Sequence, residues 1–590
     1  MKAVLAIAAL TALIPATALA REGEVRAGST ASPSRDGVPV QLSAEQRTGY
    51  QAVFASIHAG KWTEARLQLA ALPAGPLHAV ALAEILAGKG SPKATPEDLA
   101  KLLADAPELP QAELIARLAR ARGAATLPEL PYVRALSWQR GAPARRRAQA
   151  TRSDLVAADL AAKMQPLVKE DRAADAQALL EATPGLSTDA TTEWQSRVAW
   201  IYYLAGDMGN ARAMAAKAVA GTGDWAVQGE WITGLAAWRA GDYGAASDAF
   251  ARTASRTGDV ELRSAALFWG ARADMAGGKP ERIETRLKSA AQYDETFYGL
   301  LARQSLGLAA RSEPARARRT ADWDMLGKRT NVRTAAALLE IGEERLADDL
   351  IRHQARIGDV NEFPALVRVA GALDRPALQF WLAHNAPAGA QAPADGRYPA
   401  PSWTPDGGWR VDRALVFAHT LQESNFRTDV VSPAGAYGLM QLRPAAAADI
   451  ARGRGIRTDR AALTRPQTNI EIGQSYLELL RDRPETGGLL PKVIAAYNAG
   501  PTPVEAWNAQ IRDGGDPLLY IESIPYWETR GYVVTVLRNY WMYESASGRA
   551  ASPSRAALSQ GLWPRFPGLP GAPAVRIGQT KKPVETASAD

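Results

Sequence analysis

Apolar residues recur at helical spacing along most of the chain, and short clusters of Gly, Pro and polar residues interrupt them. Alanine and arginine are abundant, whereas runs of β-branched residues are scarce. This composition favours helices over strands. We therefore predict an all-α fold.

Part of this helical pattern repeats. The Gly-Asp turns at 206–207 and 241–242 lie about 35 residues apart, close to the period of helix-hairpin repeats. Similar passages begin at His58 and Asp274. Large side chains that can fill the seam between stacked hairpins precede three of these turns, at Trp200, Trp238 and Trp269. The spacing favours a solenoid of hairpins over an irregular helical bundle.

The pattern also predicts how the 590 residues divide, because so long a chain forms more than one domain. Stretches rich in Pro, Gly and polar residues without periodicity indicate linkers or disorder. The predicted segments are a signal peptide at 1–20, a disordered segment at 21–40, a helical repeat region at 41–320, a region of short helices at 321–385, a linker at 386–405, a compact unit at 406–548 and a disordered tail at 549–590.

Residues 1–20 have the features of a secretory signal peptide. Lys2 precedes an apolar stretch that reaches about Ile14, and the triplet Ala-Leu-Ala at 18–20 supplies small residues for cleavage. This stretch is too short to span a bilayer, and no other segment is long and apolar enough, so we expect no membrane anchor. The chain has no cysteine, which excludes disulfides, thiolate metal ligands and lipid attachment through an N-terminal Cys. We expect an exported protein.

The formal net charge of +7 suits an anionic polymer, an anionic membrane surface or nucleic acid, and does not choose among them. Export argues against nucleic acid. Two basic runs, near Arg140 and Arg311, are typical of solvated loops, and a binding role for either is the alternative.

A carboxylate at the end of an apolar run is the first candidate for chemistry. Residues 415–418 are Leu-Val-Phe-Ala, and Glu423 follows near the end of the same predicted helix, which Asn425 can close in a left-handed conformation. Partial burial raises the pKa of a carboxyl, so that it stays protonated near neutral pH, as a general acid must. Taken alone, a glutamate near a helix end is more often a solvated residue.

Segments downstream add groups that can bind a polar ligand. Ser432 precedes a proline, the pairing of an N-cap hydroxyl with Pro at the first helical position. The nearby glycines let the backbone approach a ligand, and Gln441 offers an amide that both donates and accepts. Tyr497 ends an apolar helix, where a partly buried tyrosine is the alternative interpretation. Glu522 lies ahead of a long aromatic-rich helix.

Five motifs occur in order across about 130 residues: ES at 423, SPAG at 432, GLMQL at 438, AYNAG at 496, and ESIP followed by ETR from 522 to 530. Together they resemble the soluble lytic murein transglycosylases, a family with a goose-lysozyme-like catalytic domain behind a helical superhelix. Any one motif is weak, whereas five in order at compatible spacing are specific. The hairpins and the segment TFYGLLARQSLG at Thr296 extend the resemblance upstream.

The resemblance implies an α-superhelix at 41–320, a small helical linker domain at 321–385 and a lysozyme-like SLT catalytic domain at 406–548. It further implies a periplasmic enzyme that acts on peptidoglycan glycan strands and requires no metal or other cofactor. The upstream helices would then hold the glycan strand, since every catalytic motif lies after Trp409.

The resemblance also implies the roles of individual residues. Glu423 would be the single catalytic acid/base, in a sugar-binding cleft lined by Ser432, Gln441, Tyr497 and Glu522. One departure is Arg443, where relatives commonly carry methionine. This arginine could add a donor for substrate carboxylates.

A single acid without an evident partner points to substrate assistance, an exception to the two-carboxylate mechanism of most glycosidases. We expect cleavage between N-acetylmuramic acid and N-acetylglucosamine by intramolecular attack, which forms a 1,6-anhydro ring. One alternative is a hydrolytic muramidase in which Glu522 or Asp429 activates water. The other is a scaffold that binds glycan without cutting it. The sequence leaves open the protein partners, the oligomeric state, the dependence on stem peptides, and whether chain ends or interiors are cut.

Overall fold

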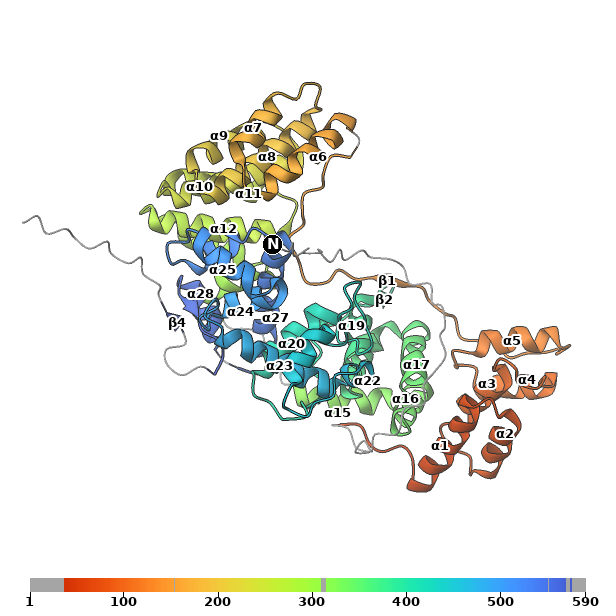
Figure 1. The fold of residues 1–590 in the computed structure, drawn as a ribbon. Helices are drawn as coiled ribbons and strands as arrows, with labels where there is room; N and C mark the ends of the chain where they lie inside the picture. Colours follow the sequence, from red (N-terminus) through yellow and green to blue (C-terminus); the bar gives the residue numbers. More distant parts are fainter. Residues whose placement is uncertain (1–36, 153, 309–314, 550, 569–573, 576–590) are drawn as a thin grey trace, which may run out of the picture. The chain divides into compact units, whose positions relative to one another are not determined.

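The computed structural model describes residues 37–152, 154–308, 315–549, 551–568 and 574–575. Within these ranges the chain forms helices α1 to α28, two short 3-10 helices and four strands of two or three residues (Figure 1). The predicted all-α fold is confirmed. The predicted signal peptide and most of the segment predicted to be disordered at 21–40 lie outside the described residues.

The chain divides into two compact units. The first unit comprises residues 1–141, 313–403 and 425–427, and the second comprises residues 142–312, 404–424 and 428–590. The predicted repeat region at 41–320 is therefore split between the two units. Its later hairpins belong with the C-terminal region because they bury apolar surface against it, as the stacked rings of Phe297 and Trp541 illustrate.

The first unit has one hydrophobic cluster to which helices from both of its main segments contribute. Its elements are α1 (Ala44–His58), α2 (Trp62–Ala71), α3 (His78–Ala87), α4 (Pro96–Asp105), α5 (Ala112–Ala121), β1 (Leu136–Trp138), α15 (Ala315–Leu326), α16 (Thr330–Glu340), α17 (Glu344–Ile357), η1 (Val360–Glu362), α18 (Phe363–Ala372), α19 (Pro376–His384), β2 (Asn385–Pro387) and η2 (Ala394–Arg397). Strands β1 and β2 pair antiparallel.

The second unit combines the later hairpins with the C-terminal helices. Its elements are α6 (Leu155–Lys169), α7 (Ala173–Glu181), α8 (Thr188–Ala205), α9 (Met208–Val219), α10 (Gly223–Arg239), α11 (Tyr243–Arg256), α12 (Val260–Ala276), α13 (Pro280–Ala291), α14 (Phe297–Ser305), α20 (Arg413–Ser424), α21 (Pro444–Ala451), α22 (Arg460–Leu463), α23 (Pro466–Asp482), α24 (Leu490–Ala499), α25 (Pro501–Gln510), α26 (Pro517–Ser523), α27 (Trp527–Ala546), α28 (Pro553–Ser559), β3 (Trp563–Pro564) and β4 (Ala574–Val575).

Helices α8 to α13 form three hairpins that pack in chain order (Figure 1). The first two turns share the same chemistry. Gly206 and Gly241 have positive φ angles of 86° and 75°, a conformation that glycine adopts without strain. Asp207 and Asp242 then cap the next helix by accepting a backbone N–H three residues on. The predicted hairpin repeat is confirmed for this part of the chain.

Aromatic side chains fill the seam between these hairpins, as predicted. Trp269 is fully buried, and its ring meets Trp238 edge-on with the centroids 5.3 Å apart. Trp200 stacks on Tyr203 with the centroids 5.1 Å apart. Rings of this size bury large apolar areas, so they stabilise the stack more than alanines at the same positions could.

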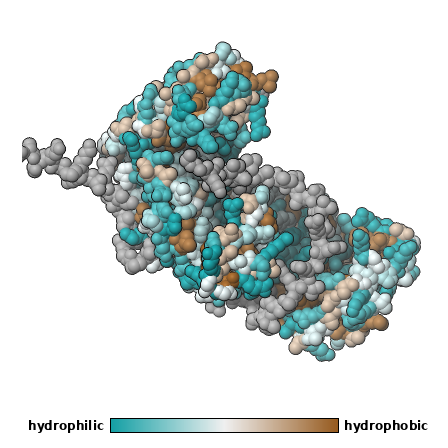
Figure 2. All heavy atoms as spheres, viewed as in Figure 1, coloured by the Kyte–Doolittle hydropathy of each residue, from teal (hydrophilic) through white to brown (hydrophobic). Residues whose placement is uncertain are grey.

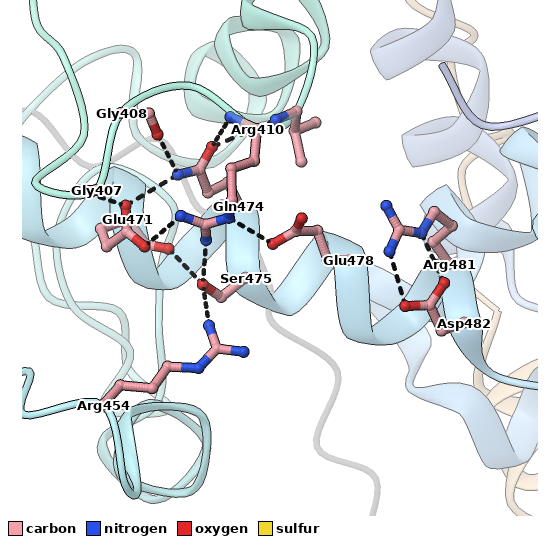
Figure 3. A network of polar contacts seen from close by, with 11 residues as sticks. Gly407, Gly408, Arg410, Arg454, Glu471, Gln474, Ser475, Glu478, Arg481 and Asp482 are labelled. Carbon is pink, nitrogen blue, oxygen red and sulfur yellow. Dashed lines mark hydrogen bonds and ion pairs between the residues drawn. The ribbon is translucent and has the colours of Figure 1, made fainter. Parts of the chain in front are cut away.

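A polar network anchors the start of the C-terminal region to α23 (Figure 3). The Arg410 guanidinium contacts Glu471 at 2.7 Å and Glu478 at 3.0 Å, and donates to the Ser475 hydroxyl at 2.8 Å. The side-chain oxygen of Gln474 accepts the Arg410 backbone N–H at 3.0 Å. This network fixes the segment that leads into α20.

Two stretches predicted to lack regular structure are ordered. In the stretch predicted as a linker, Ser402 donates from both its backbone and its hydroxyl to Asp374, at 2.8 and 2.7 Å. In the stretch predicted as a tail, Trp563 is buried, and Ser554 accepts a bond from the Trp541 indole at 2.9 Å. Buried aromatic contacts of this kind outweigh the Pro and Gly content that suggested disorder.

The described hydrophobic residues on the surface do not form one dominant patch on the visible face (Figure 2). Figure 2 shows hydrophilic residues over much of the visible face, with hydrophobic residues in separate patches. In the parts of the chain that the structure describes, every helix is too short or too polar to cross a bilayer. The basic run near Arg311 lies largely outside the described residues.

Candidate active site

Glu423 lies in the last turn of α20, as predicted. The apolar residues at 415–418 before it are buried, and its own side chain is partly exposed. The helix ends at Ser424 because Asn425 and Phe426 adopt left-handed φ angles of 50° and 62°. The role predicted for Asn425 in closing the helix is confirmed. The turn leaves Glu423 at the edge of the hydrophobic core, where part of its hydration is lost.

The hydroxyl of Tyr532, on α27, donates a hydrogen bond of 2.6 Å to Glu423 Oε1. Burial raises the pKa of Glu423 from 4.5 to about 7, against the lowering effect of the Tyr532 bond, and the charge of Glu528 adds to the rise. The carboxyl is then protonated in about half of the molecules at neutral pH. A group that gives and recovers a proton in one turnover needs such a pKa.

His419 supports Tyr532 from the other side. Its Nδ1 lies 2.9 Å from the Tyr532 oxygen and donates to it, because the Tyr532 proton is directed at Glu423. The imidazole is fully buried, and burial lowers the pKa of His419 to about 3, so the ring is neutral. Its Nε2 has no hydrogen-bond partner among the described residues. A relay of neutral donors therefore orients the carboxyl.

The loop after α20 is fixed by a buried amide. Asn469, on α23, donates to the carbonyl oxygens of Tyr437 at 3.1 Å and Leu463 at 2.7 Å, and accepts the Met440 N–H at 2.9 Å. Gly438 has a φ of 72°, and a Cβ there would lie 2.4 Å from the Leu463 oxygen. The glycine of GLMQL is thus required by this close approach.

Ser432 and Gln441 use their side chains within this loop. The Ser432 hydroxyl accepts the Ala436 N–H at 3.0 Å, and no helix begins at the proline that follows it. The predicted helix N-cap is wrong, because Gly435, at a φ of 74°, turns the chain back before a helix can form. The Gln441 amide donates to a carbonyl of its own loop at 2.8 Å. Its side-chain oxygen is then the atom better placed to accept a bond from a ligand.

Tyr497 joins the same cluster. Its hydroxyl donates to the Met440 carbonyl at 2.8 Å, and its ring centroid lies 4.6 Å from that of His419. Burial raises the pKa of Tyr497 well above its ordinary value, and the nearby Glu423 charge raises it further. Because its proton is directed at Met440, the oxygen can accept an N–H from a ligand rather than donate to a ligand carbonyl.

Glu522 lies elsewhere. Its side chain is fully buried, and its two carboxylate oxygens contact the Arg145 guanidinium at 2.6 and 3.0 Å. The Tyr298 hydroxyl also donates to Glu522, at 2.7 Å. The expected place in a sugar-binding cleft is therefore corrected: both carboxylate oxygens are bonded to upstream residues, and the side chain has no exposed surface to offer a glycan.

The same contact corrects part of the interpretation of the basic run near Arg140. Arg145 belongs to this run and is mostly buried, with its guanidinium also 5.0 Å from the centre of the Trp231 ring. Burial opposes its charge, but the Glu522 carboxylate outweighs this effect and raises the pKa of Arg145. Arg147 nearby is exposed.

The two remaining predicted residues are on the surface. Arg443 is exposed at the start of α21, and Asp429 is exposed in the loop after α20. Sequence reasoning missed three buried supports of Glu423 and its loop, namely His419, Asn469 and Tyr532. A helical stripe could have pointed to Tyr532, since it lies four residues before the buried Val536 on α27.

The structure thus defines an all-α protein with one partly buried carboxyl held among tyrosines beside a glycine-dependent loop. Residues 406–518 match the family described as the transglycosylase SLT domain. The resemblance stated from the five motifs is confirmed.

Two relatives in the sequence comparison are named soluble lytic murein transglycosylases. The chain is 36% identical over 160 residues to the protein of Salmonella typhimurium and 37% identical over 132 residues to that of Escherichia coli. These matches cover 27% and 22% of this chain, and only 24% and 20% of the two relatives.

Solved structures resemble the chain over a greater length. The 70 kDa soluble lytic transglycosylase of Escherichia coli aligns with 88% of this chain and 99% of its own, with a TM-score of 0.51 and 18% identity. An inactive mutant of the lytic transglycosylase Slt of Pseudomonas aeruginosa aligns with 85% and 82%, with a TM-score of 0.50 and 21% identity. At these identities the likeness concerns the fold.

Proposed function

We propose that this protein is a lytic transglycosylase of peptidoglycan. It cleaves the β-1,4 bond between N-acetylmuramic acid and N-acetylglucosamine and leaves a 1,6-anhydromuramic acid end. The observation that carries the proposal is the Glu423 carboxyl, whose pKa is raised to about 7 while Tyr532 holds one of its oxygens in place.

In the proposed reaction, protonated Glu423 gives its proton to the glycosidic oxygen as the bond to C1 of the muramic residue breaks. The N-acetyl carbonyl of the same residue stabilises the positive charge at C1, as in substrate-assisted glycosidases. Ionised Glu423 then takes the proton of the C6 hydroxyl, whose oxygen attacks C1 and closes the anhydro ring. The acid is restored, and neither water nor a second carboxylate takes part.

Three residues support these steps. Tyr532 keeps the carboxyl oriented between its two proton transfers. Tyr497 presents a hydroxyl oxygen that can accept the N–H of the acetamido group, which would turn the carbonyl toward C1. Gln441 contributes its amide oxygen from the adjoining loop. Exposed Arg443 remains a candidate for binding substrate carboxylates.

A hydrolytic muramidase on the same substrate is the second candidate. It needs a base that activates water, and the sequence offered Glu522 or Asp429. The buried ion pair with Arg145 disfavours Glu522, which leaves the exposed Asp429 as the candidate for that role. A non-catalytic scaffold is disfavoured by the raised pKa of Glu423, since a binding module has no need of one.

The setting follows from the substrate. Peptidoglycan strands are the proposed partner, with neither nucleic acid nor a membrane anchor involved, and the periplasm is the proposed location. The signal peptide that would direct export falls in residues 1–20, outside the described part of the chain.

The decisive experiment is digestion of purified sacculi by the mature chain, followed by mass spectrometry of the released muropeptides. The anhydro product is lighter than the hydrolysis product by one water. Exclusively anhydro ends are expected. Hydrated reducing ends in place of anhydro ends would make the protein a muramidase. No release of muropeptides at all would make it a scaffold.

A further inference from the structure

A cavity of about 650 Å³ lies within the second unit, between the hairpins and the C-terminal helices. One wall consists of hairpin residues that include Trp238 and Tyr243, and the opposite wall is the loop at 512–516 with Leu519. Its volume is in the range of sites for small ligands. Glu423 does not line it, so the cavity is separate from the candidate active site.

Arginines dominate the charge of this cavity. Arg239, Arg272 and Arg512 line it, against Asp513 and Asp516. The Asp516 carboxylate is already engaged, since it contacts Arg272 at 2.7 Å and accepts the Leu518 N–H at the start of α26. Asp513 is then the one other carboxylate among the described residues of the lining, against Arg239 and Arg512. The cavity therefore retains a net positive character.

Arg272 also has an unused donor. Its Nη2 bonds to Asp516, whereas its Nη1 is buried with no hydrogen-bond partner among the described residues. Leaving a buried donor without a partner destabilises the folded protein, and a hydrogen bond from this donor to a ligand acceptor would offset that cost. The guanidinium also lies over the rings of Trp238 and Trp269, at 4.7 and 4.4 Å from their centres, and these contacts help to hold it in place.

Arg512, on the other side of the cavity, adds a hydrogen-bond donor on a flexible, exposed side chain. Arg512 is exposed, and a Cβ on Gly206 would lie 3.4 Å from its Nη1, so its guanidinium lies against the first hairpin turn. Trp238 and Tyr243, whose ring centroids are 5.2 Å apart, supply an apolar wall between the arginines.

We propose that this cavity is a second binding site, which takes a carboxylate-bearing fragment of peptidoglycan. The forked donors of arginine match the two oxygens of a carboxylate, and the aromatic wall suits the apolar side of a sugar or a peptide. The identity of the fragment rests on the proposed function. Its carboxylate can come from a stem peptide or from the lactyl group of a peptide-free glycan.

Two methionines allow the cavity and the active site to be observed separately. Met208 lines the cavity, whereas Met440 lies beside the active site, where its carbonyl accepts the bond from Tyr497. The full chain carrying Glu423→Gln, labelled with ¹³C at the methionine methyls, is titrated with three probes: a stem peptide, a peptide-free glycan with free lactyl groups, and neutral chitotetraose. The eight methionines give few signals, and Met208→Leu identifies the one that reports the cavity.

We expect the Met208 signal to move with the stem peptide, the peptide-free glycan or both, and to stay in place with chitotetraose. Arg512→Glu should weaken this binding about tenfold or more, because an attractive charge becomes repulsive. Arg282→Glu, at an exposed arginine that does not line the cavity, makes the same change of net charge and should leave the affinity unaltered. Which of the two probes binds identifies the source of the carboxylate.

Inorganic phosphate is titrated as a further control. Three results would overturn the proposal: a Met208 signal that none of the three probes moves, equal affinity in the Arg512→Glu and Arg282→Glu chains, or a Met208 response to phosphate equal to the response to the carboxylate-bearing probes. The outcome is independent of the reaction. If sacculi released no anhydro product while Met208 responded to the stem peptide, the proposed activity would fail and the site would stand.

Discussion

The guanidinium of Arg145 contacts both carboxylate oxygens of Glu522, although 377 residues separate the two in the chain. Tyr298 donates to the same carboxylate at 2.7 Å, and it receives a bond from the Trp269 indole at 3.0 Å. The tryptophans of the hairpin seam and the ESIP motif are thus parts of one buried network. In this protein the Glu of that motif joins the upstream helices to the C-terminal helices of the second unit.

Arg145→Met should destabilise the second unit by about 3–5 kcal/mol, because Glu522 is left buried and unpaired. The double variant Arg145→Met, Glu522→Gln should recover much of the loss, since no uncompensated charge remains. Scanning calorimetry measures both effects as shifts of the melting transition. Arg147→Met, at the exposed arginine two residues on, is the matched control. Equal melting of the Arg145 and Arg147 variants would mean that the ion pair does not stabilise the fold.

Glu423→Gln should fold normally and lose activity by about a thousandfold or more, because the amide can neither donate nor recover a proton. Release of anhydro-muropeptides from sacculi is the readout, and Glu505→Gln, at an exposed glutamate on α25, is the control. The pH dependence of the unaltered chain carries the same information. Since the reaction starts from the protonated acid, turnover should fall as pH rises above about 7. Substantial turnover by a folded Glu423→Gln chain would place the acid elsewhere.

The raised pKa of Glu423 also makes a prediction about stability. A carboxyl that titrates near 7 when folded and near 4.5 when unfolded contributes its full stability below pH 4.5, and this is lost as pH rises through 7. Glu423→Gln does not ionise, so relative to the unaltered chain it should gain stability between pH 5 and pH 8. The gain is at most about 3 kcal/mol. Urea unfolding at several pH values measures it, and a difference that stays constant with pH would exclude the buried, uncharged carboxyl.

Tyr532→Phe tests the orienting hydrogen bond. The tyrosine donates to Glu423 and so lowers its pKa, which means that the phenylalanine variant should lose activity on the alkaline side at a higher pH than the unaltered chain. Turnover at neutral pH should fall about tenfold, because the carboxyl is no longer held for both proton transfers. Tyr526→Phe changes an exposed tyrosine and should alter neither property. A purely structural role for Tyr532 would lower activity without moving the alkaline limb.

Local chemistry explains which parts of the fold could be predicted. The Gly206 and Gly241 turns and the end of α20 at Asn425 depend on residues next to one another in the sequence, and the structure has them as predicted. The structure differs from the predicted disordered tail at 551–568, because the order of this segment comes from contacts with other parts of the chain. Trp541 binds Ser554, and Trp563 packs on Tyr520, and no local pattern shows either contact.

The residues of the candidate site also divide into those that a local sequence pattern indicates and those that only the packing of the fold reveals. Glu423 and Tyr497 carry a signal because a polar group at the end of an apolar helix is unusual. A helical stripe shared with Val536 places Tyr532 on the buried face of α27, but only the packing of α27 on α20 directs its hydroxyl at Glu423. The expectation for Glu522 failed for the opposite reason. The motif marks an important glutamate, but the partner that decides its role, Arg145, lies in a run that looks like a solvated loop.

The network around Glu522 changes the expected role of the hairpins. From the sequence alone, a chain cut just before Trp403 should keep its activity on short glycans, because every catalytic motif lies after that point. In the structure such a fragment loses Arg145 and Tyr298, and it exposes the face of Trp541 that stacks on Phe297 at 5.0 Å between centroids. A buried charge without its partner and an uncovered aromatic face both destabilise the fragment.

We therefore predict that residues 404–590 alone melt well below the second unit of the full chain and turn over short, soluble glycans poorly. Co-expression with residues 142–312 as a separate chain should restore both properties, because the two segments belong to one compact unit. Restoration should fail when the added segment carries Arg145→Met and succeed when it carries Arg147→Met. Calorimetry and the release of anhydro ends from short glycans are the two measurements. A fragment 404–590 that alone equals the full chain in both would show that the hairpins serve only to hold the glycan strand.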